Sequence, residues 1–295
     1  MASLGVFDGV HRGHVHLLRE AIALAHDEGL PMVAVLPDRH PRTVVDPDNL
    51  PRILTDLPHR FELLERVGVD HVYVLRFDEE RSLQPAEDFM EEVLVGQVGA
   101  TALVAGEDFH FGHRRKGDAA LVASLAASMG LKTATVPLLR DEHAGEVISS
   151  TLVREVVAAG RVDRASELLD RPHELRGIVE HGDARGRTIG FPTANVAVPG
   201  AIALPTDGVY AGWYVDPDGV AHASAINIGR RPTFYDENGL LLVEAHLIDF
   251  DGDLYGQHAG VRVVHHLREE IRFSGVEALV EQLGRDVARA REVLA

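Results

Sequence analysis

Two histidines near the N-terminus, His11 and His14, stand three residues apart in the sequence FDGVHRGH. At the start of a helix, this spacing places both imidazoles on one side of the first turn. Gly9 and Gly13 let a phosphate approach the backbone closely, and a helix N-terminus adds N–H donors and a partial positive charge. The cluster therefore suits stabilisation of charge that develops on phosphorus. A glycine-rich turn that carries surface histidines is the alternative.

A second group of polar residues, SSTLVR, stands at 149–154. Ser149, Ser150 and Thr151 lie at the mouth of a helix predicted at roughly 151–159, and Arg154 falls in its first turn. Hydroxyl residues before a helix are usually N-caps. Three hydroxyls and an arginine at one helix mouth also form a good triphosphate site.

A third group, GEDFHFG at 106–112, follows a predicted strand and contains Asp108 and Phe109. On its own it could be an acidic surface loop. Its place directly after a strand makes it a candidate ligand loop, since α/β proteins bind ligands outside the carboxyl ends of their strands.

The longest chemical motif is GDARGRTIGFPTAN, residues 182–195. Thr193 and Asn195 carry a hydroxyl and an amide oxygen, which are hard ligands suited to Mg²⁺. The glycines and arginines of the run can wrap a polyphosphate; they are Gly182, Arg185, Gly186, Arg187 and Gly190. A flexible glycine-rich hairpin would explain GDARGR alone, but it explains the full run poorly.

The elements that must position the first three groups alternate between strands and helices. The apolar pattern predicts strands at 2–7, 32–36, 71–77, 101–106 and 131–137, with helices at 14–29, 57–67, 85–97 and 118–129. Such alternation indicates a parallel sheet with helices on both faces. The two histidines then lie at the carboxyl end of the first strand, where such sheets bind ligands.

The second half of the chain has a different pattern. Two short helical segments follow residue 148, with Gly160 between them, and short strands separated by turns come next. This pattern predicts a small antiparallel barrel or sandwich, followed by a helix at 275–294 that starts with a capping box of Ser274 and Glu277. We therefore expect two domains, 1–170 and 171–295.

Composition limits the partners. The formal net charge is −17, which disfavours binding to nucleic acid or to an anionic membrane. No apolar run approaches the roughly 20 residues that cross a bilayer. Cysteine is absent, so there is no disulfide framework and we expect a cytoplasmic protein. Any phosphate site must be locally positive.

Together, HxGH, GxDFxFG and SSTxxR resemble the transferase half of the bacterial bifunctional riboflavin kinase/FMN adenylyltransferases, also called FAD synthetases. The run from Gly182 to Asn195 resembles the riboflavin kinase signature of the same family. Four further segments match the kinase module in order: DGVYA (207–211), INIG (226–229) with PTF (232–234), VEAHL (243–247) and DFDGDLYG (249–256). The resemblance covers essentially the whole chain.

The resemblance implies a Rossmann-like nucleotidyltransferase domain followed by a β-barrel kinase domain. The barrel would phosphorylate riboflavin to FMN with ATP and Mg²⁺, and the first domain would adenylylate FMN to FAD and release pyrophosphate. Glu244 would be the general base of the kinase, and His11 and His14 would hold the ATP phosphates. By the same resemblance Thr193 and Asn195 are Mg²⁺ ligands, and the flavin-binding residues are Asp108, Phe109, Asn227 and Arg268.

Two alternatives remain at this point. The family usually reads FDPHP after its second strand, whereas this chain reads PDRHP at 37–41. A protein in which only the kinase is active would follow if this change weakens the first domain. The other alternative is a flavin- or nucleotide-binding regulator without turnover, although a pure sensor has no need of the catalytic base Glu244.

Overall fold

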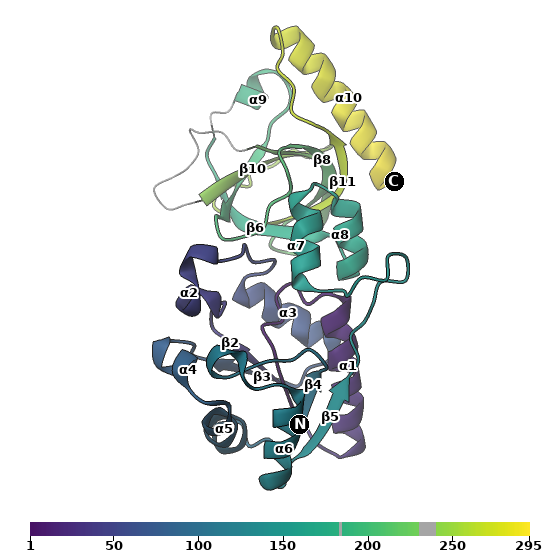
Figure 1. Ribbon diagram of the computed structural model, residues 1–295. Coiled ribbons are helices and arrows are strands. Elements are labelled where there is room, and N and C mark those ends of the chain that lie inside the picture. The colour runs from purple at the N-terminus through teal and green to yellow at the C-terminus, as the bar shows by residue number, and fades with distance from the viewer. Residues whose placement is uncertain (183–184, 230–239) are drawn as a thin grey trace. The chain divides into compact units, whose positions relative to one another are not determined.

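The computed structural model describes residues 1–182, 185–229 and 240–295 of the chain. Contacts divide it into two units, Met1–Leu152 and Val153–Ala295 (Figure 1). The first unit is a parallel α/β sheet, and the second is a closed antiparallel β-barrel followed by a long helix. This confirms the predicted fold class of both halves.

The sheet of the first unit has the strand order β3-β2-β1-β4-β5, and every neighbouring pair is parallel. Chain order reverses between β1 and β4, so the loops that follow these two strands flank a crevice at the topological switch point. The five strands are β1 (Ala2–Leu4), β2 (Val33–Pro37), β3 (His71–Leu75), β4 (Ala102–Gly106) and β5 (Lys132–Val136).

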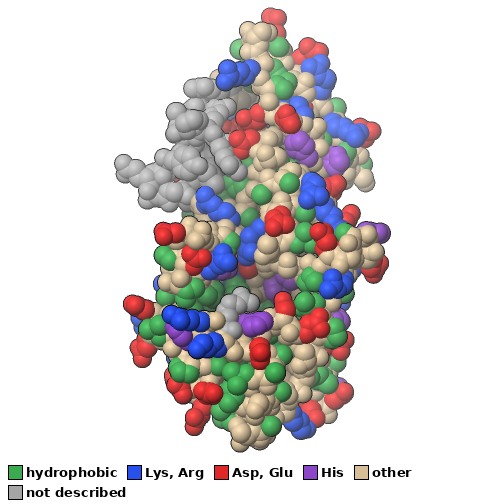
Figure 2. All heavy atoms as spheres, in the orientation of Figure 1, with side chains coloured by type: hydrophobic (Ala, Val, Ile, Leu, Met, Phe, Trp, Pro, Cys, Tyr) green, Lys and Arg blue, Asp and Glu red, His purple; other side chains and the backbone are tan. Residues whose placement is uncertain are grey.

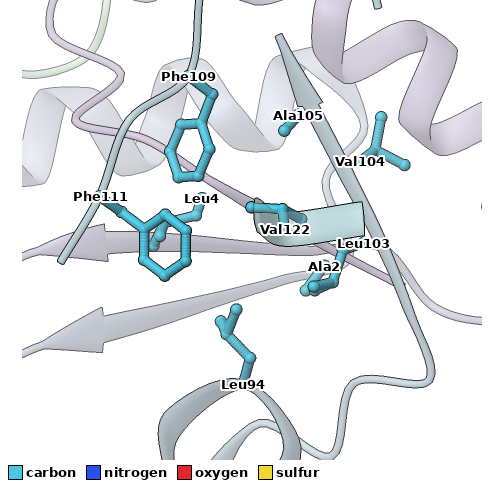
Figure 3. A pocket seen from close by; sticks show the side chains of 9 residues that line it. All are labelled: Ala2, Leu4, Leu94, Leu103, Val104, Ala105, Phe109, Phe111 and Val122. Carbon is cyan, nitrogen blue, oxygen red and sulfur yellow. The ribbon is translucent and has the colours of Figure 1, made fainter. Parts of the chain in front are cut away.

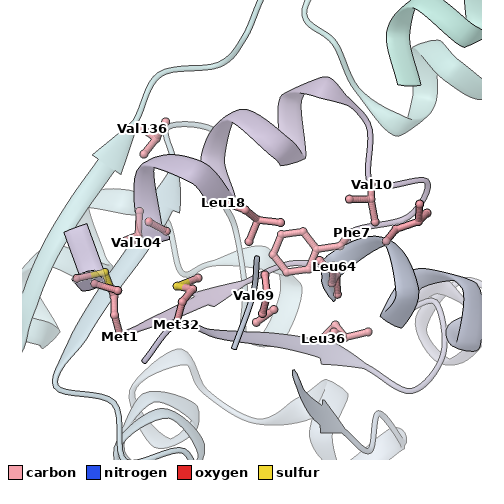
Figure 4. Packing of buried hydrophobic residues seen from close by; sticks show 14 of the residues in the cluster. Met1, Phe7, Val10, Leu18, Met32, Leu36, Leu64, Val69, Val104 and Val136 are labelled. Carbon is pink, nitrogen blue, oxygen red and sulfur yellow. The ribbon is translucent and has the colours of Figure 1, made fainter. Parts of the chain in front are cut away.

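Helices cover both faces of this sheet because apolar residues recur at helical spacing. In α1 (Arg12–Asp27) the side chains of Leu18, Ala21 and Ala25 are buried and pack with those of α3 (Leu57–Val67) in the cluster drawn in Figure 4. The opposite face packs against α5 (Ala86–Phe89), the π-helical segment η2 (Met90–Gln97) and α6 (Ala119–Ser128). Short helices in the connections are α2 (Arg42–Val45), η1 (Pro47–Asn49), α4 (Glu79–Leu83) and η3 (His113–Arg115).

The first strand is shorter than the sequence predicts. β1 ends at Leu4 rather than at residue 7, and Phe7 adopts φ +49°, which is incompatible with an extended strand. The apolar character of Phe7 reflects burial of its ring in the core beneath α1, where it is 1% exposed.

The barrel of the second unit closes in the order β10-β7-β6-β11-β8-β9, with antiparallel pairing throughout. Its strands are β6 (His173–Glu180), β7 (Ala194–Pro199), β8 (Gly208–Val215), β9 (Ala221–Ile228), β10 (Leu240–Leu247) and β11 (His258–Arg268). The helices of this part of the chain are α7 (Ser150–Ala158), α8 (Val162–Leu169), α9 (Arg185–Thr188) and α10 (Val276–Leu294). Gly160, with φ +72°, makes the turn between α7 and α8.

The predicted capping box of α10 is wrong. The helix begins at Val276, so its N-cap is Gly275, which has no side chain to donate or accept. Ser274 stands one residue too early to cap it. The helix is instead held to the barrel by Arg268, whose guanidinium donates to the buried carboxylate of Asp286 at 2.7 to 3.1 Å.

The surface carries both charge signs. Acidic and basic side chains are interspersed over the face shown in Figure 2, despite the strongly negative net charge. None of the helices in the described part of the chain combines the length and the apolar character that crossing a membrane requires.

Candidate active sites

The imidazoles of His11 and His14 lie against each other at the N-terminus of α1. His11 is the N-cap residue, and its Nδ1 accepts a hydrogen bond from the backbone N–H of His14 at 3.3 Å. The two rings stack with centroids 3.6 Å apart and an interplanar angle of 21°. The ring of Phe7 meets His14 edge-on at 5.3 Å. Two imidazoles are thus gathered at the N-terminus of a helix, a place that suits an anionic ligand.

The two glycines of this motif make close packing within the protein possible. An ideal Cβ on Gly13 would lie 2.7 Å from the carbonyl oxygen of Ile148, and one on Gly9 would lie 2.7 Å from Cδ1 of Leu54. Gly9 also has φ +79°, which favours glycine. The sequence predicts that both glycines let a phosphate approach the backbone, and in the structure they also let two distant chain segments reach the loop.

The three hydroxyl-bearing residues at 149–151 lie against the same loop, which Ser150 contacts directly. The Ser150 hydroxyl donates to the backbone oxygen of Asp8 at 2.9 Å, and the Ser149 hydroxyl oxygen accepts from Leu152 N–H at 3.3 Å. A hydroxyl has one proton. The Ser149 proton is therefore not used in its bond to Leu152, whereas Ser150 uses its proton to bind the loop.

The other two residues of this motif stand further along the helix. Thr151 is exposed on the first turn of α7, and Arg154 is half-buried one turn on, among the residues that contacts assign to the second unit.

Asp108 and Phe109 occupy the turn after β4, at the switch point. Asp108 is exposed, and its carbonyl oxygen accepts from Nδ1–H of His110 at 2.7 Å. The Phe109 ring lies nearly parallel to that of Phe111, with centroids 5.5 Å apart. Both rings line a small apolar cavity over β1 and β4 (Figure 3). Its volume of about 20 Å³ has room for about one water molecule, so a flavin ring is not accommodated inside it in this conformation.

The altered PDRHP loop has an internal ion pair. Arg39 donates to Asp38 at 2.9 Å, and Asp38 also accepts from Phe77 N–H at 2.9 Å. Although partial burial acts to raise it, the pKa of Asp38 lies below its ordinary value because of these hydrogen bonds. His40 accepts from Arg42 N–H at 3.2 Å at the start of α2. The positive charge of Arg39, which stands where the family usually has proline, is thus balanced by the neighbouring Asp38.

In the barrel, register brings Glu244 beside two asparagines. Glu244 on β10 pairs directly with Asn195 on β7 and with Asn227 on β9, and Asn195 pairs in turn with Glu180 on β6. Directly opposed residues on antiparallel strands share one face. We call the row Glu180, Asn195, Glu244 and Asn227 the polar belt. The adjacent row is almost fully buried and forms the barrel interior: Val179, Val196, Val243 and Ile228. The belt therefore faces outward.

The glycine-rich run folds over this outer face. An ideal Cβ on Gly182 would lie 2.2 Å from Nδ2 of Asn195, so the glycine lets the backbone rest directly on that amide. At the other end, Nδ1–H of His246 donates to the carbonyl oxygen of Pro192 at 2.7 Å, and the ring of Phe191 lies 5.3 Å from the imidazole. This cover explains why Asn195, on the outer face, is only 8% exposed. Thr193 is half-buried two residues before Asn195.

The remaining glycines and arginines of the run form its short helix and turn. Arg185 begins α9, and Gly186 accepts from Phe191 N–H at 2.9 Å. Arg187 is exposed on α9, and Gly190 follows with φ +85°. Asp183 and Ala184 of the motif, and the PTF segment at 232–234, lie outside the described residues.

One of the two flavin candidates of the barrel lies in the belt, and the other, Arg268, lies on β11. Asn227 belongs to it, and both Asn227 and Arg268 pair with Val209 on β8. The Arg268 guanidinium is bound to Asp286 as described above. Its role toward a flavin stays a prediction.

Sequence reasoning missed several residues that build these sites. Thr55 and Arg60 contact the loop before α1 from 46 and 54 residues away, and nothing in their sequence context signals it. His246 was detectable, because it shares a strand face with Glu244. Among the described residues no group of three or more His, Cys, Asp and Glu could hold a metal ion. Thr193 and Asn195 differ from such a group, because their side chains offer neutral oxygen donors.

Comparison with known families matches both units. The sequence profile of the FAD synthetase family matches residues 1–152, and that of the riboflavin kinase family matches residues 169–294.

Full-length relatives carry both activities in their names. A bifunctional riboflavin kinase/FMN adenylyltransferase from Pseudomonas fluorescens is 38% identical over 296 residues, covering 100% of this chain and 93% of the relative. One from Haemophilus influenzae is 36% identical over 294 residues, covering 98% and 92%. A crystal structure described as a macrolide-efflux protein from Streptococcus pneumoniae is 31% identical, with a TM-score of 0.88 and coverage of 98% of this chain and 93% of that one.

Proposed function

The chain belongs to the family of bifunctional riboflavin kinase/FMN adenylyltransferases, and we propose that it makes FAD from riboflavin in two ATP-dependent steps, one in each unit. The kinase step moves the γ-phosphoryl group of ATP to the 5′-hydroxyl of riboflavin and yields FMN and ADP. The adenylyl step joins the FMN phosphate to the α-phosphorus of ATP and releases pyrophosphate. We assign the adenylyl step to residues 1–170 and the kinase step to residues 171–295.

One observation carries the kinase assignment: Glu244 lies between Asn195 and Asn227 in the polar belt, beneath the glycine-rich run. Glu244 takes the proton of the ribityl hydroxyl as that oxygen attacks phosphorus. The glycine-rich backbone and Arg187 hold the ATP phosphates. Phosphoryl transfer needs little more from a protein than this positioning and charge neutralisation.

The residues present fit a bound Mg²⁺. Thr193 and Asn195 offer a hydroxyl and an amide oxygen, the hard donors that Mg²⁺ prefers when substrate phosphates supply further ligands. Because position 182 is glycine, no Cβ presses on the Asn195 amide from this side. When bound, Mg²⁺ would neutralise charge on the ATP phosphates. Thr193 and Asn195 would hold the phosphate chain in position for attack by the hydroxyl that Glu244 deprotonates.

For adenylyl transfer, His11 and His14 stabilise negative charge on the α-phosphate oxygens while the FMN phosphate attacks. The start of α1 adds backbone N–H donors. Ser149, whose proton is available, and Thr151 bind the remaining phosphate oxygens. A chain with net charge −17 needs such a locally positive point to bind ATP and FMN together, because both ligands are anions.

Chromatography of flavins tests this function directly. The full chain is incubated with riboflavin, ATP and Mg²⁺, and the products are resolved. FAD supports the two-step function. FMN without FAD would indicate a kinase alone and locate the failure in the first unit, whereas unchanged riboflavin would refute the proposal and favour a binding protein.

A further inference from the structure

The loop that leads into His11 has an unusual backbone. Phe7 and Val10 adopt φ +49° and +38°, in the left-handed region that side-chain-bearing residues rarely enter, and Gly9 between them has φ +79°. Only one of these three residues is glycine. The other two persist in this conformation only if surrounding contacts impose it.

The carboxylate of Asp8 supplies the first of these contacts. Asp8 is 1% exposed, and its oxygens accept from the N–H groups of Leu54 at 3.0 Å and Thr55 at 3.1 Å and from the guanidinium of Arg60 at 3.3 Å. A buried carboxylate is tolerated only where donors of this kind satisfy it. The side chain points into the protein, so it does not act on a bound nucleotide.

Arg60 supplies the second contact. It is 4% exposed, and besides Asp8 it donates to the backbone oxygens of Val6 at 3.0 Å and Thr55 at 2.8 Å. The Thr55 hydroxyl oxygen accepts from Gly9 N–H at 3.0 Å. Arg60 and Thr55 thus bind residues 6, 8 and 9, which are the residues that surround and include the left-handed turn.

Asp8 also links the two phosphate motifs of this unit. Its carbonyl oxygen accepts from the Ser150 hydroxyl at 2.9 Å, while its carboxylate is bound to Arg60. A shift of Asp8 would therefore move the histidine loop and the start of α7 together.

We propose that Asp8 and Arg60 form a positioning pair for the transfer of the adenylyl group. The pair holds the left-handed loop so that the His11 and His14 imidazoles stay stacked at the start of α1, beside the hydroxyls at 149–151. Neither residue touches substrate; both act through the histidines. This inference rests on the proposed adenylylation of FMN by the first unit.

The test replaces Arg60 with methionine in the full chain and measures FMN adenylylation and riboflavin phosphorylation in the same preparation. A misplacement of about 1 Å in a reacting group costs about 10²-fold in rate, so kcat for FMN adenylylation should fall by about that factor while KM for ATP changes little. Phosphorylation of riboflavin should keep its wild-type rate. Arg60→Lys keeps the charge opposite Asp8 but not the planar fork that reaches Val6 and Thr55, so it should restore only part of kcat.

Arg81→Met is the matched control. Arg81 pairs with Glu92 at 3.2 Å in the same unit, and in the described part of the chain its guanidinium binds Gln84 and Glu92, not the loop that precedes α1. Its loss should leave kcat for FMN adenylylation at the wild-type value. An equal loss in this variant would overturn the proposal, because the effect would then be a general one of removing an ion pair.

A folded Arg60→Met protein with wild-type kcat would overturn the positioning role, and so would a rise in KM without a fall in kcat. Cooperative urea unfolding shows whether Arg60→Met folds. If it does not fold, Arg60→Lys provides the test instead. A wild-type kcat for FMN adenylylation in Arg60→Lys overturns the proposal, and a reduced kcat supports it. Failure of the unmodified chain to adenylylate FMN refutes the proposed function itself, and that result is seen before any variant is made.

Discussion

Replacing Gly182 with alanine should disable the phosphorylation of riboflavin and leave the adenylylation of FMN intact. Gly182 rests on the side chain of Asn195, and an ideal Cβ there would lie 2.2 Å from Nδ2 and 2.8 Å from Cγ of that residue. Ordinary contacts begin at 3.4 Å. The Asn195 amide must therefore retreat by about 1 Å, or the backbone of the glycine-rich run must lift by a similar amount.

The size of the effect follows from where Asn195 stands. It is 8% exposed and pairs directly with Glu244, so its displacement disturbs the phosphate position relative to the base. A misplacement of this size costs about 10²-fold in rate, which corresponds to about 2.7 kcal/mol of transition-state stabilisation. We expect a kcat for FMN formation of about one hundredth of the wild-type value.

The assay follows FMN formation from riboflavin by chromatography, then FAD formation from added FMN in the same preparation. Gly284→Ala is the matched control, since an ideal Cβ at that position of α10 has no heavy atom within 4 Å. It should phosphorylate riboflavin at the wild-type rate. If Gly182→Ala also keeps the wild-type kcat, Asn195 does not position the phosphates and the reasoning from the polar belt fails.

Other variants separate the two sites and probe the barrel. Glu244→Gln should lower FMN formation by about 10² to 10⁴-fold through loss of the base and leave FAD formation from FMN unchanged; an unchanged rate of FMN formation would exclude Glu244 as the base. His14→Ala should do the converse, with about a 10²-fold loss in FMN adenylylation, and loss of both activities in a folded protein would contradict two separate sites. Tyr214→Phe should leave the free energy of unfolding unchanged or raise it, because the buried Tyr214 hydroxyl has no hydrogen-bond partner in the described part of the chain. Tyr210→Phe should lower it by about 1 kcal/mol, since the Tyr210 hydroxyl donates to Thr206 at 2.6 Å; urea titration measures both. Burial, with a nearby aspartate in each case, raises the pKa of Tyr210 and of Tyr214 to about 12, above the ordinary value of about 10. The folded barrel therefore holds these protons more tightly than the unfolded chain, and its stability should be fully present below pH 10 and fall as the pH rises toward 12. Urea midpoints that stay constant over that range would contradict this.

Much of the fold could be predicted because apolar periodicity and length distinguish strand from helix in α/β units. The predicted bounds of α3, 57–67, agree with the structure, since its apolar face and the glycine after it are both local signals. The end of β1 could not be predicted. Phe7 has a left-handed φ, and the residues that bind Val6 and Gly9 on either side of it, Arg60 and Thr55, lie far along the chain.

In the candidate sites, too, local sequence patterns predict some features and distant contacts determine the others. The pairing of His11 with His14 followed from helical spacing alone, and the strand face shared by Glu244 and His246 followed from alternation. The neighbours of Glu244 could not be foreseen without the family resemblance, because Asn195 and Asn227 reach it through strand register. Arg268 illustrates the limit most clearly, since its partner Asp286 lies on a helix whose packing on the barrel no local pattern encodes.

Closure of the barrel has a consequence for how the kinase half can change in evolution. In an open sheet a strand that gains or loses a residue can slide along its neighbour, but a closed barrel has no edge at which to absorb the slip. Deleting one residue within β10 would turn Glu244 into the apolar interior and bring Val243 or Ala245 to the outer face. Length variation is therefore expected only in the turns, such as 216–219 and 249–253, whereas the strands that carry the polar belt should tolerate substitution but not insertion or deletion.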